Sequence, residues 1–359
     1  MRIGIPKEVK EDEYRVAMTP AGVTELVASG HEVLIESGAG GGVHIDDARY
    51  QGAGAKIVSQ VEDVYSADLV VKVKEPIALE YALFRPGQTL FCFLHLAADL
   101  PLTQALMDSG VVAIGYETVE TDDGRLPLLA PMSEVAGRMA TQAGTRFLEA
   151  PHGGRGVLLG GVAGVPSAKV TVVGGGIVGA NAALIALGMG ATVTIIDIDV
   201  DRLRYLEEVL SGRVSTRMGN KLDISEAVVD SDLVVGAVLT PGAKASKLIS
   251  EDVVERMRVG TVIVDVAIDQ GGCVETIEPT THSDPVRVVH GVLHYAVTNI
   301  PSAVPNTATH ALTNSTLPWI MEIAEHGWRE SCRLHPELRR GLNIAEGEIR
   351  HVGVAAAFG

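Results

Sequence analysis

The stretch that decides the fold is KVTVVGGGIVGANAALIALGMGATVTIIDID, residues 169–199. An apolar strand-like run ends at a glycine cluster, a helix of small residues follows, and a second apolar run ends at Asp197. Gly174, Gly176 and Gly179 form the spacing G-x-G-x-x-G at the junction of strand and helix. Such glycines permit a tight turn, the close approach of a pyrophosphate, and close packing of helix on strand. The strand–helix–strand context therefore predicts a dinucleotide-binding unit.

Asp197 indicates which nicotinamide cofactor this unit takes. A carboxylate at the end of the second strand accepts hydrogen bonds from ribose hydroxyls, whereas it repels the 2′-phosphate of NADP. Arg202 could attract a phosphate, but the neighbouring aspartates keep the segment acidic. We therefore expect NAD as the cofactor, with Ile177, Val178 and Arg202 also at its site.

Apolar strand-like runs alternate with helical stretches over most of the chain. This alternation is typical of parallel sheets with crossover helices, and it predicts an α/β fold of two doubly wound Rossmann-like domains with a cleft between them. From about residue 306 the pattern is helical and no longer alternates. We expect residues 1–130 plus 306–359 to form a substrate and catalytic domain, and residues 131–305 to form the NAD-binding domain.

The two halves of the chain also echo each other. SGHEVLIESGAG parallels MGATVTIIDID, and RPGQTLFCFLHLA parallels RVGTVIVDVAID. In this register His95 and Asp269 follow equivalent strands, and ligands of open α/β sheets bind at the carboxyl ends of strands. Short apolar strands look alike, however, so a common type of strand start is an alternative explanation of the echo that needs no shared function.

Composition narrows the class of protein. The chain has 359 residues, 47% of them hydrophobic and 21% charged, which suits two folded cores. The formal net charge of -16 argues against nucleic acid and anionic membranes as partners. Residues 157–196 carry only Lys169 as a charge, but glycines and Pro166 interrupt them, so we expect no membrane span.

The cysteines and the first residues bear on the compartment. Cys92, Cys273 and Cys332 are scattered and lack C-x-x-C spacing, which favours neither a disulfide framework nor a zinc site. No His pair or carboxylate cluster has ligand spacing, so no metal is expected. The charged N-terminal segment lacks the apolar run of a secretory signal. The expected location is the cytoplasm.

Longer motifs carry a resemblance that extends over essentially the whole chain. They are IGIPKEVKEDEYRVAMTPAGV, VVKVKEP, FCFLHLAAD, LAPMSEVAGRMATQAG, HGGRGVLLGGVAGVP, VDVAIDQGGC and NIPSAVPNTATHALTN. Together they resemble the bacterial L-alanine dehydrogenase family, whose cousin is the NAD-binding subunit of nicotinamide nucleotide transhydrogenase. The resemblance implies reversible oxidative deamination, in which L-alanine, NAD and water give pyruvate, ammonium and NADH. It also implies a homohexamer.

The resemblance assigns roles to four residues. Arg15 and Lys74 match the positions that hold the substrate carboxylate and carbonyl, and His95 matches the catalytic histidine. Asp269 matches a second catalytic position, where it would orient the water or amine or stabilise positive charge on the imino intermediate. Considered alone, Arg15 would be a surface charge, Lys74 a strand-end lysine, and His95 a core residue near the end of a buried strand.

Further positions match the family's cofactor site. Ser133 precedes the helical segment EVAGRMATQAG, where it would cap the helix, contact the cofactor, or do both. The apolar residues in this set are equally typical of sheet core. The other matched positions are Val238, Leu239, Ala267, Asn299 and Ile300.

Two alternatives remain open. One is a non-catalytic NAD-binding module of the transhydrogenase type, which would not need Arg15, Lys74, His95 and Asp269. The other is an enzyme of the same fold that acts on a bulkier amino acid, such as a saccharopine-type dehydrogenase.

Overall fold

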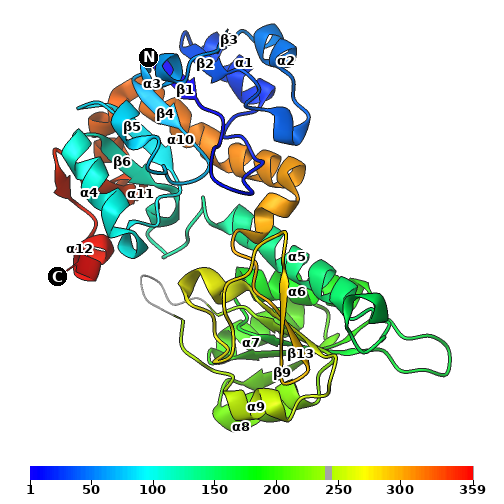
Figure 1. The fold of residues 1–359 in the computed structure, drawn as a ribbon. Coiled ribbons are helices and arrows are strands. Elements are labelled where there is room, and N and C mark those ends of the chain that lie inside the picture. Colours follow the sequence, from blue (N-terminus) through cyan, green and yellow to red (C-terminus); the bar gives the residue numbers. More distant parts are fainter. Residues whose placement is uncertain (239–244, 359) are drawn as a thin grey trace. The chain divides into compact units, whose positions relative to one another are not determined.

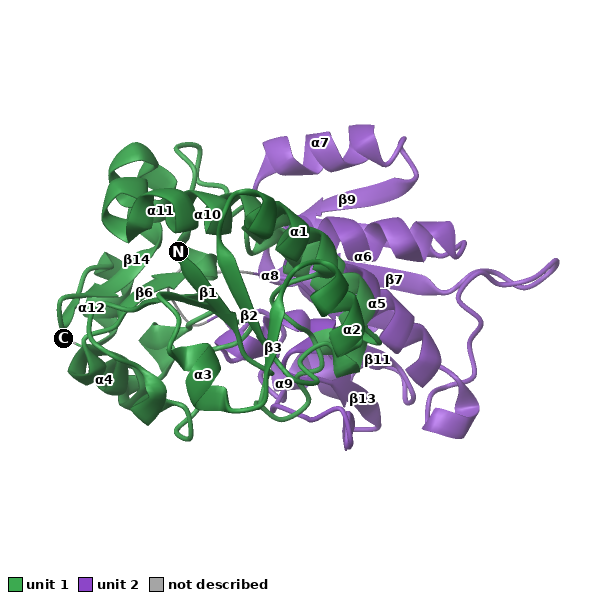
Figure 2. Ribbon diagram, turned by 90° about the horizontal axis from the view of Figure 1, so that it is seen from above, with its two compact units in different colours: residues 1–132, 302–359 green, residues 133–301 purple. Residues whose placement is uncertain are grey.

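The computed structural model describes residues 1–238 and 245–358, and the chain divides into two compact units (Figure 2). Unit 1 comprises Met1–Met132 and Ser302–Gly359, and unit 2 comprises Ser133–Pro301.

These divisions lie near, but not at, the positions expected from the sequence, which were 130/131 and 305/306. The first falls in the opening turn of helix α5 (Ala130–Phe147), and the second falls in the 3-10 turn η7 (Ile300–Ala303). No change in composition marks either position in the sequence.

Unit 1 is built on a sheet that has eight strands within the described residues, in the order β15-β14-β6-β5-β4-β1-β2-β3. The first six strands along the chain run parallel, and β14 and β15 add antiparallel pairings at one edge. The parallel part has the order 3-2-1-4-5-6 of a doubly wound sheet. The strands are β1 (Arg2–Ile5), β2 (Glu32–Glu36), β3 (Lys56–Val58), β4 (Leu69–Val71), β5 (Thr89–Cys92), β6 (Val112–Gly115), β14 (Leu342–Ala345) and β15 (Glu348–Ile349).

The helices of unit 1 come from both ends of the chain, as the blue and orange-to-red ribbons show (Figure 1). The longest, α10, begins with Pro305, which is favourable in a first helical turn, and it is interrupted at Gly327, where φ is 72°. The helices are α1 (Pro20–Ala28), α2 (Asp47–Gly52), α3 (Val61–Tyr65), α4 (Leu100–Ser109), α10 (Pro305–Leu334), α11 (Pro336–Gly341) and α12 (Val352–Phe358).

The parallel strands of unit 2 repeat the order 3-2-1-4-5-6 found in unit 1. Its sheet is β12-β13-β11-β10-β7-β8-β9, in which all pairings except that of β12 with β13 are parallel. The strands are β7 (Lys169–Val173), β8 (Thr192–Asp197), β9 (Val214–Met218), β10 (Leu233–Gly236), β11 (Val262–Asp265), β12 (Val286–Val289) and β13 (Val292–Tyr295). The prediction of two doubly wound α/β domains is therefore confirmed for each unit.

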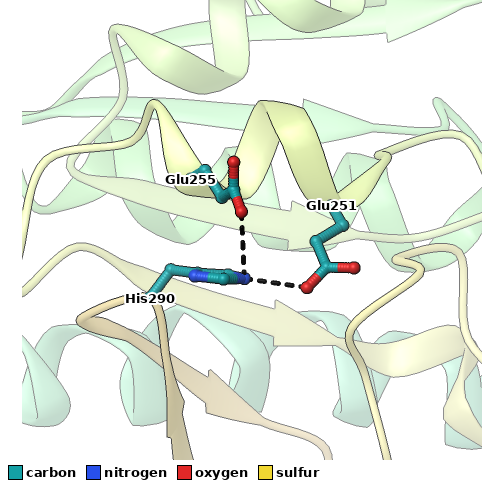
Figure 3. A group of neighbouring side chains, drawn as sticks. All are labelled: Glu251, Glu255 and His290. Carbon is teal, nitrogen blue, oxygen red and sulfur yellow. Dashed lines mark hydrogen bonds and ion pairs between the residues drawn. The ribbon is translucent and has the colours of Figure 1, made fainter.

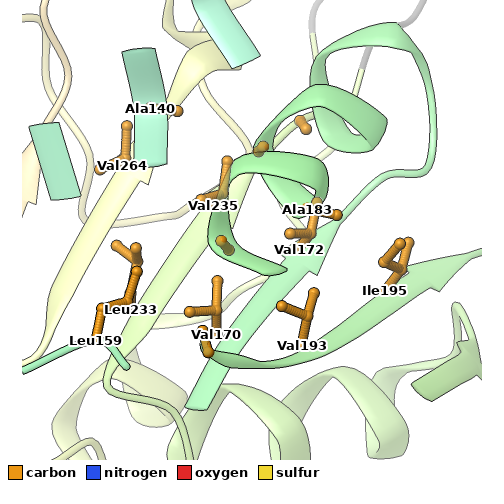
Figure 4. Packing of buried hydrophobic residues seen from close by; sticks show 14 of the residues in the cluster. Ala140, Leu159, Val170, Val172, Ala183, Val193, Ile195, Leu233, Val235 and Val264 are labelled. Carbon is orange, nitrogen blue, oxygen red and sulfur yellow. The ribbon is translucent and has the colours of Figure 1, made fainter. Parts of the chain in front are cut away.

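The core of unit 2 explains why its central strands are almost entirely apolar. Ala140 of α5 and Ala183 of helix α6 (Ile177–Gly188) pack with the valines of β7 and β10 (Figure 4). Gly137 of α5 faces α6 so closely that a Cβ would lie 2.2 Å from the carbonyl oxygen of Val178. The remaining helices are α7 (Val200–Val209), α8 (Lys221–Val229) and α9 (Glu251–Glu255).

The apolar region 157–196 becomes an irregular segment followed by β7, α6 and most of β8. Among the helices that the structure describes, none combines the length and the apolar character needed to cross a membrane.

The echo between the halves has a structural counterpart. Strands β5 and β11 both occupy the fifth position of their 3-2-1-4-5-6 order. His95 comes three residues after the end of β5, and Asp269 comes four residues after the end of β11. Since β5 stops at Cys92, His95 lies just beyond the strand end, as expected, but its side chain is exposed and is not the core residue that its sequence context alone suggested.

A buried ionic network braces the strand ends of unit 1. Lys72 Nζ lies 3.2 Å from Glu8 Oε2 and 2.8 Å from Glu80 Oε1, and all three side chains are buried. Glu8 also accepts a hydrogen bond from the Val73 backbone N–H at 2.6 Å. Burial alone would lower the pKa of Lys72, but the two carboxylates reverse this effect and raise it. The network therefore ties the loop after β1 to the loop after β4.

We expect Lys72→Met to lower the free energy of unfolding by about 3–5 kcal/mol, because it leaves two buried carboxylates without their counter-charge. The matched control is Lys56→Met, which removes an exposed ion pair with Glu32 and should cost at most about 1 kcal/mol. Urea unfolding of both variants measures the difference. Equal losses would show that the Lys72 network contributes no more than a surface pair.

Candidate active site

The glycine loop between β7 and α6 has the geometry that a pyrophosphate requires. Gly174 has a φ of 105°, and a Cβ there would lie 2.5 Å from the carbonyl oxygen of Ala237. A Cβ on Gly179 would lie 1.9 Å from the carbonyl oxygen of Gly174. A Cβ on Gly176, in contrast, would meet no atom of the described residues within 4 Å. Packing thus dictates two glycines, while the third leaves open space at the N-terminus of α6, where an anion is stabilised.

Asp197 ends β8 beside this loop. Its Oδ2 accepts a hydrogen bond from the Gly175 backbone N–H at 2.5 Å, and its Oδ1 accepts one from the Asp199 N–H at 2.9 Å. Arg202 donates from Nε to the Gly175 carbonyl oxygen at 2.6 Å and lies over the Tyr205 ring. The carboxylate and the guanidinium are therefore both held against the glycine loop.

Ser133 differs from its expected position. Ser133 was expected just before a helix, where it would act as an N-cap. Helix α5 already begins at Ala130, however, and Ser133 is its fourth residue. The Ala130 backbone N–H donates to the Leu126 carbonyl oxygen, and Pro131 fits the first turn because its missing N–H has no helical partner there. Ser133 is half-buried inside the helix and is not its N-cap.

The other residues expected at the cofactor site have varied environments. Ile177 is exposed at the start of α6, and Val178, next along the helix, is half-buried. Ala267 lies in the 3-10 turn η6 (Val266–Gln270) and is buried. Ile300 is also buried, as part of the apolar cluster of unit 2.

Three further expected residues lie in connecting segments. Val238 follows β10 and is half-buried. Asn299 has a positive φ of 62° and precedes η7. Leu239 lies outside the described residues.

Asp269 is exposed on η6, and a different aspartate holds that turn in place. Asp265, which ends β11, is fully buried and accepts hydrogen bonds from the backbone N–H groups of Ala267 at 3.0 Å and Cys273 at 2.7 Å. Burial raises the pKa of Asp265, although these N–H groups favour its charged form. Asp265 therefore anchors the turn that carries Asp269.

In unit 1, the expected substrate residues follow three adjacent strands. Arg15 lies in the loop after β1, Lys74 follows β4, and His95 follows β5, and these strands are neighbours in the order β5-β4-β1. Parallel strands end at one edge of their sheet, so the three loops share that edge.

Arg15 is not the surface charge that its sequence context suggested. Its side chain is only 2% exposed, and it forms a two-pronged ion pair with Glu13, at 2.7 Å from Nε and 2.5 Å from Nη2. Its Nη1 lies 3.0 Å from Met132 Sδ. The buried carboxylate of Glu13 fixes the guanidinium. No pattern in the sequence around Arg15 predicts that it forms a buried ion pair with Glu13.

Lys74 is mostly buried, and its ammonium lies near a second carboxylate. Lys74 Nζ is 3.9 Å from Glu75 Oε2, and Glu75 Oε1 forms an ion pair with Lys10. Burial raises the pKa of Glu75, but Lys74, His95 and Lys10 together outweigh burial and lower it to about 2. Glu75 is therefore ionised near neutral pH beside both Lys74 and His95.

His95 adopts a left-handed backbone conformation, with φ 51° and ψ 33°. Its ring stacks parallel to the buried ring of Phe93, at 5.9 Å between centroids. The exposed imidazole thus has one face covered and its nitrogens accessible, as proton exchange with a substrate requires.

One group of possible metal ligands occurs in the described part of the chain, in unit 2. Glu251 and Glu255 on α9 face His290 in the turn between β12 and β13 (Figure 3). His290 Nε2 lies 2.9 Å from a Glu251 oxygen and 3.7 Å from a Glu255 oxygen, and all three side chains are substantially exposed. Ordinary surface ion pairs account for this arrangement.

Comparison with known proteins identifies the family. Residues 4–136 match the family model "Alanine dehydrogenase/PNT, N-terminal domain", and residues 140–352 match "Alanine dehydrogenase/PNT, C-terminal domain". The chain belongs to the alanine dehydrogenase/PNT family.

Relatives in this family match over the whole chain. The alanine dehydrogenase of Mycobacterium tuberculosis H37Rv is 55% identical over 100% of this chain and 97% of its own length. The enzyme of Staphylococcus haemolyticus is 54% identical over 100% and 96%.

Solved structures agree with the family assignment. An L-alanine dehydrogenase structure superimposes with a TM-score of 0.97 at 50% identity, covering 100% of this chain and 99% of that one. A transhydrogenase from Sinorhizobium meliloti has a TM-score of 0.83 at 24% identity, covering 98% and 99%, and shares the fold.

The two kinds of glycine in the loop can be separated by substitution. We expect Gly179→Ala to destabilise the chain by about 1–3 kcal/mol or more, because its Cβ collides with a backbone carbonyl. Gly176→Ala should leave stability nearly unchanged, yet weaken dinucleotide binding by occupying the open space. Thermal unfolding and fluorescence titration with NADH measure the two effects. Similar stability for both variants would contradict the packing role of Gly179.

The depressed pKa of Glu75 predicts a pH-dependent contribution to stability. Its carboxyl has a pKa of about 2 in the folded chain, against roughly 4.3 when unfolded, so the charged form favours folding. The stability advantage of the wild type over Glu75→Gln should be complete above about pH 5 and shrink as the pH falls toward 2. Urea unfolding between pH 3 and 7 tests this. An advantage that does not change with pH would contradict it.

Proposed function

We propose that the chain catalyses the reversible NAD-dependent oxidative deamination of L-alanine to pyruvate and ammonium. The observation that carries this proposal is the set Arg15, Lys74 and His95, which follow three adjacent strands of unit 1. The family and the names of its full-length relatives support the same reaction.

Arg15 and Lys74 would bind the substrate. A guanidinium attracts and hydrogen-bonds a carboxylate, and an ammonium polarises a carbonyl oxygen. Glu13 holds Arg15 through Nε and Nη2, which fixes the orientation of the guanidinium before substrate arrives. Glu75 keeps a negative charge beside the Lys74 ammonium, with Oε2 at 3.9 Å from Nζ.

His95 would act as the acid and base. It accepts a proton from the substrate amine or from the water that attacks the imino acid, and it returns a proton in the reverse direction. Asp269 would orient that water or stabilise the positive charge of the imino group. The overall reaction consumes alanine, NAD and water and yields pyruvate, ammonium, NADH and a proton.

The residues of unit 2 fit an NAD molecule. The space beside Gly176 and the N-terminal turn of α6 suit the pyrophosphate, and Asp197 suits the ribose hydroxyls. When bound, NAD supplies the acceptor for the hydride that leaves the alanine Cα. Gly174, Gly179 and Arg202 shape or brace this loop. The other residues proposed to line the site are Ser133, Ile177, Val178, Val238, Leu239, Ala267, Asn299 and Ile300.

The alternatives have less support. A transhydrogenase-type module would not need the substrate set of unit 1, and the transhydrogenase likeness is one of fold. A dehydrogenase for a bulkier amino acid differs from the named full-length relatives, which are alanine dehydrogenases.

We further propose that the chain works as a cytoplasmic homo-oligomer, by family resemblance a hexamer. An apolar arm supports assembly. The apolar arm is residues 157–168, and a backbone bridge between Val162 and Val165 closes the turn at its tip. The side chains of Leu158, Val162 and Val165 are all more than half exposed. Such side chains favour a contact with another copy of the chain. The three buried free cysteines suit a reducing compartment.

The proposal predicts NADH formation when the purified chain is mixed with NAD and L-alanine. The rate should fall strongly with larger amino acids and when NADP replaces NAD, because Asp197 repels the added phosphate. Absorbance at the NADH band follows the reaction across a panel of amino acids. NAD binding without turnover of any amino acid would favour the module, and faster turnover of a larger amino acid would favour the third alternative.

A further inference from the structure

The loop that carries His95 needs an external partner to hold its shape. His95 lies in the left-handed region, which side chains other than glycine seldom adopt and which surrounding structure must enforce. Strand β5 has already ended at Cys92, so no sheet pairing fixes the backbone at this point. A group outside β5 must therefore hold the backbone in this conformation.

The carboxylate of Glu117 contacts two successive backbone N–H groups of this turn. The Leu94 N–H donates to it at 3.1 Å from Oε2 and 3.2 Å from Oε1, and the His95 N–H donates to Oε1 at 2.6 Å. Glu117 lies in the 3-10 turn η4 (Tyr116–Thr118), directly after β6. Since β5 and β6 are parallel neighbours with Cys92 opposite Gly115, the end of β6 reaches the loop that follows β5.

The same short turn also supports the ring of His95. Tyr116 is fully buried and packs edge-on against Phe93, with 5.1 Å between ring centroids. Phe93 in turn stacks parallel to the imidazole of His95. The residues Tyr116 and Glu117 thus fix the side chain through Phe93 and the backbone through hydrogen bonds.

Gly115 gives the Glu117 carboxylate the room it needs. A Cβ at this position would lie 3.3 Å from Glu117 Oε2 and 2.8 Å from Asn343 Nδ2, closer than ordinary contacts. A carboxylate offers two acceptor oxygens for two consecutive donors, whereas a glutamine amide offers only one and turns its NH2 group toward the other donor.

We infer that Glu117 is the positioning residue for His95, holding the imidazole where it can exchange protons with the substrate. This inference rests on the proposed function, in which His95 is the acid and base. Glu117 touches no substrate in this scheme and acts only through the loop.

The test is a double-mutant cycle of Glu117→Gln and His95→Asn, measured on the full chain with alanine and NAD. Glu117→Gln alone should lower kcat about tenfold to a hundredfold, with the KM for NAD unchanged, because a misplaced base slows proton transfer without affecting the cofactor. In the His95→Asn background, the same change should alter the residual rate less than twofold.

Two further variants make the result decisive. Asp68→Asn is the matched control, because Asp68 also accepts a backbone N–H, from Arg2 at 2.9 Å, and lies just before β4, at the opposite edge of the sheet from the His95 loop. It should keep wild-type kcat. Glu117→Asp, whose shorter side chain cannot reach both donors, repeats the cycle in case the amide variant fails to fold.

Each outcome has one meaning. Normal kcat in both Glu117 variants, with His95→Asn impaired, overturns the inference and leaves the proposed function intact. An equal loss from Glu117→Gln with and without His95 also overturns it, because Glu117 would then act elsewhere. Near-normal turnover by His95→Asn instead removes the proposed role of His95 itself.

Discussion

Parallel strands that end at one edge of their sheet are the constraint on which both candidate sites depend. Each unit arranges its parallel strands in the order 3-2-1-4-5-6, so loops far apart in the sequence come together where neighbouring strands end. In unit 1 this brings together the segments that carry Arg15, Lys74 and His95. In unit 2 it brings the glycine loop beside Asp197. The strands are apolar because both faces of each sheet are buried. Their packing side by side therefore brings together the polar residues of the loops that follow them.

Buried or half-buried carboxylates then fix these loops by accepting hydrogen bonds from the backbone. Asp265 holds the turn that carries Asp269, Glu117 holds the turn that carries His95, and Glu8 holds Val73 next to Lys74. In each case the carboxylate is mostly shielded from solvent while the residue with a proposed role in chemistry is the neighbour it positions. A buried carboxylate is costly to leave without partners, and backbone N–H groups provide them at fixed places.

The sequence predicts the two sheets and the glycine loop, but it does not predict the carboxylates that hold the other loops in place. The glycine spacing in residues 169–199 predicts the βαβ unit because steric contacts of the backbone demand glycine at Gly174 and Gly179. Alternation of strands and helices predicts the two doubly wound sheets. Glu117, in contrast, lies 22 positions after His95, in the turn that follows β6, so only the pairing of β5 with β6 brings it close. Ser133 was misplaced because three residues before it already adopt helical structure.

The central claim is that Arg15, Lys74 and His95 surround the substrate while the glycine loop and Asp197 bind NAD. A crystal structure of the chain with NADH and pyruvate tests it most directly. The account predicts the pyruvate carboxylate within hydrogen-bond distance of Arg15, its keto oxygen near Lys74 and His95, and the adenosine ribose on Asp197. Pyruvate bound without contact to Arg15 and Lys74, or a dinucleotide that avoids the glycine loop, would contradict it.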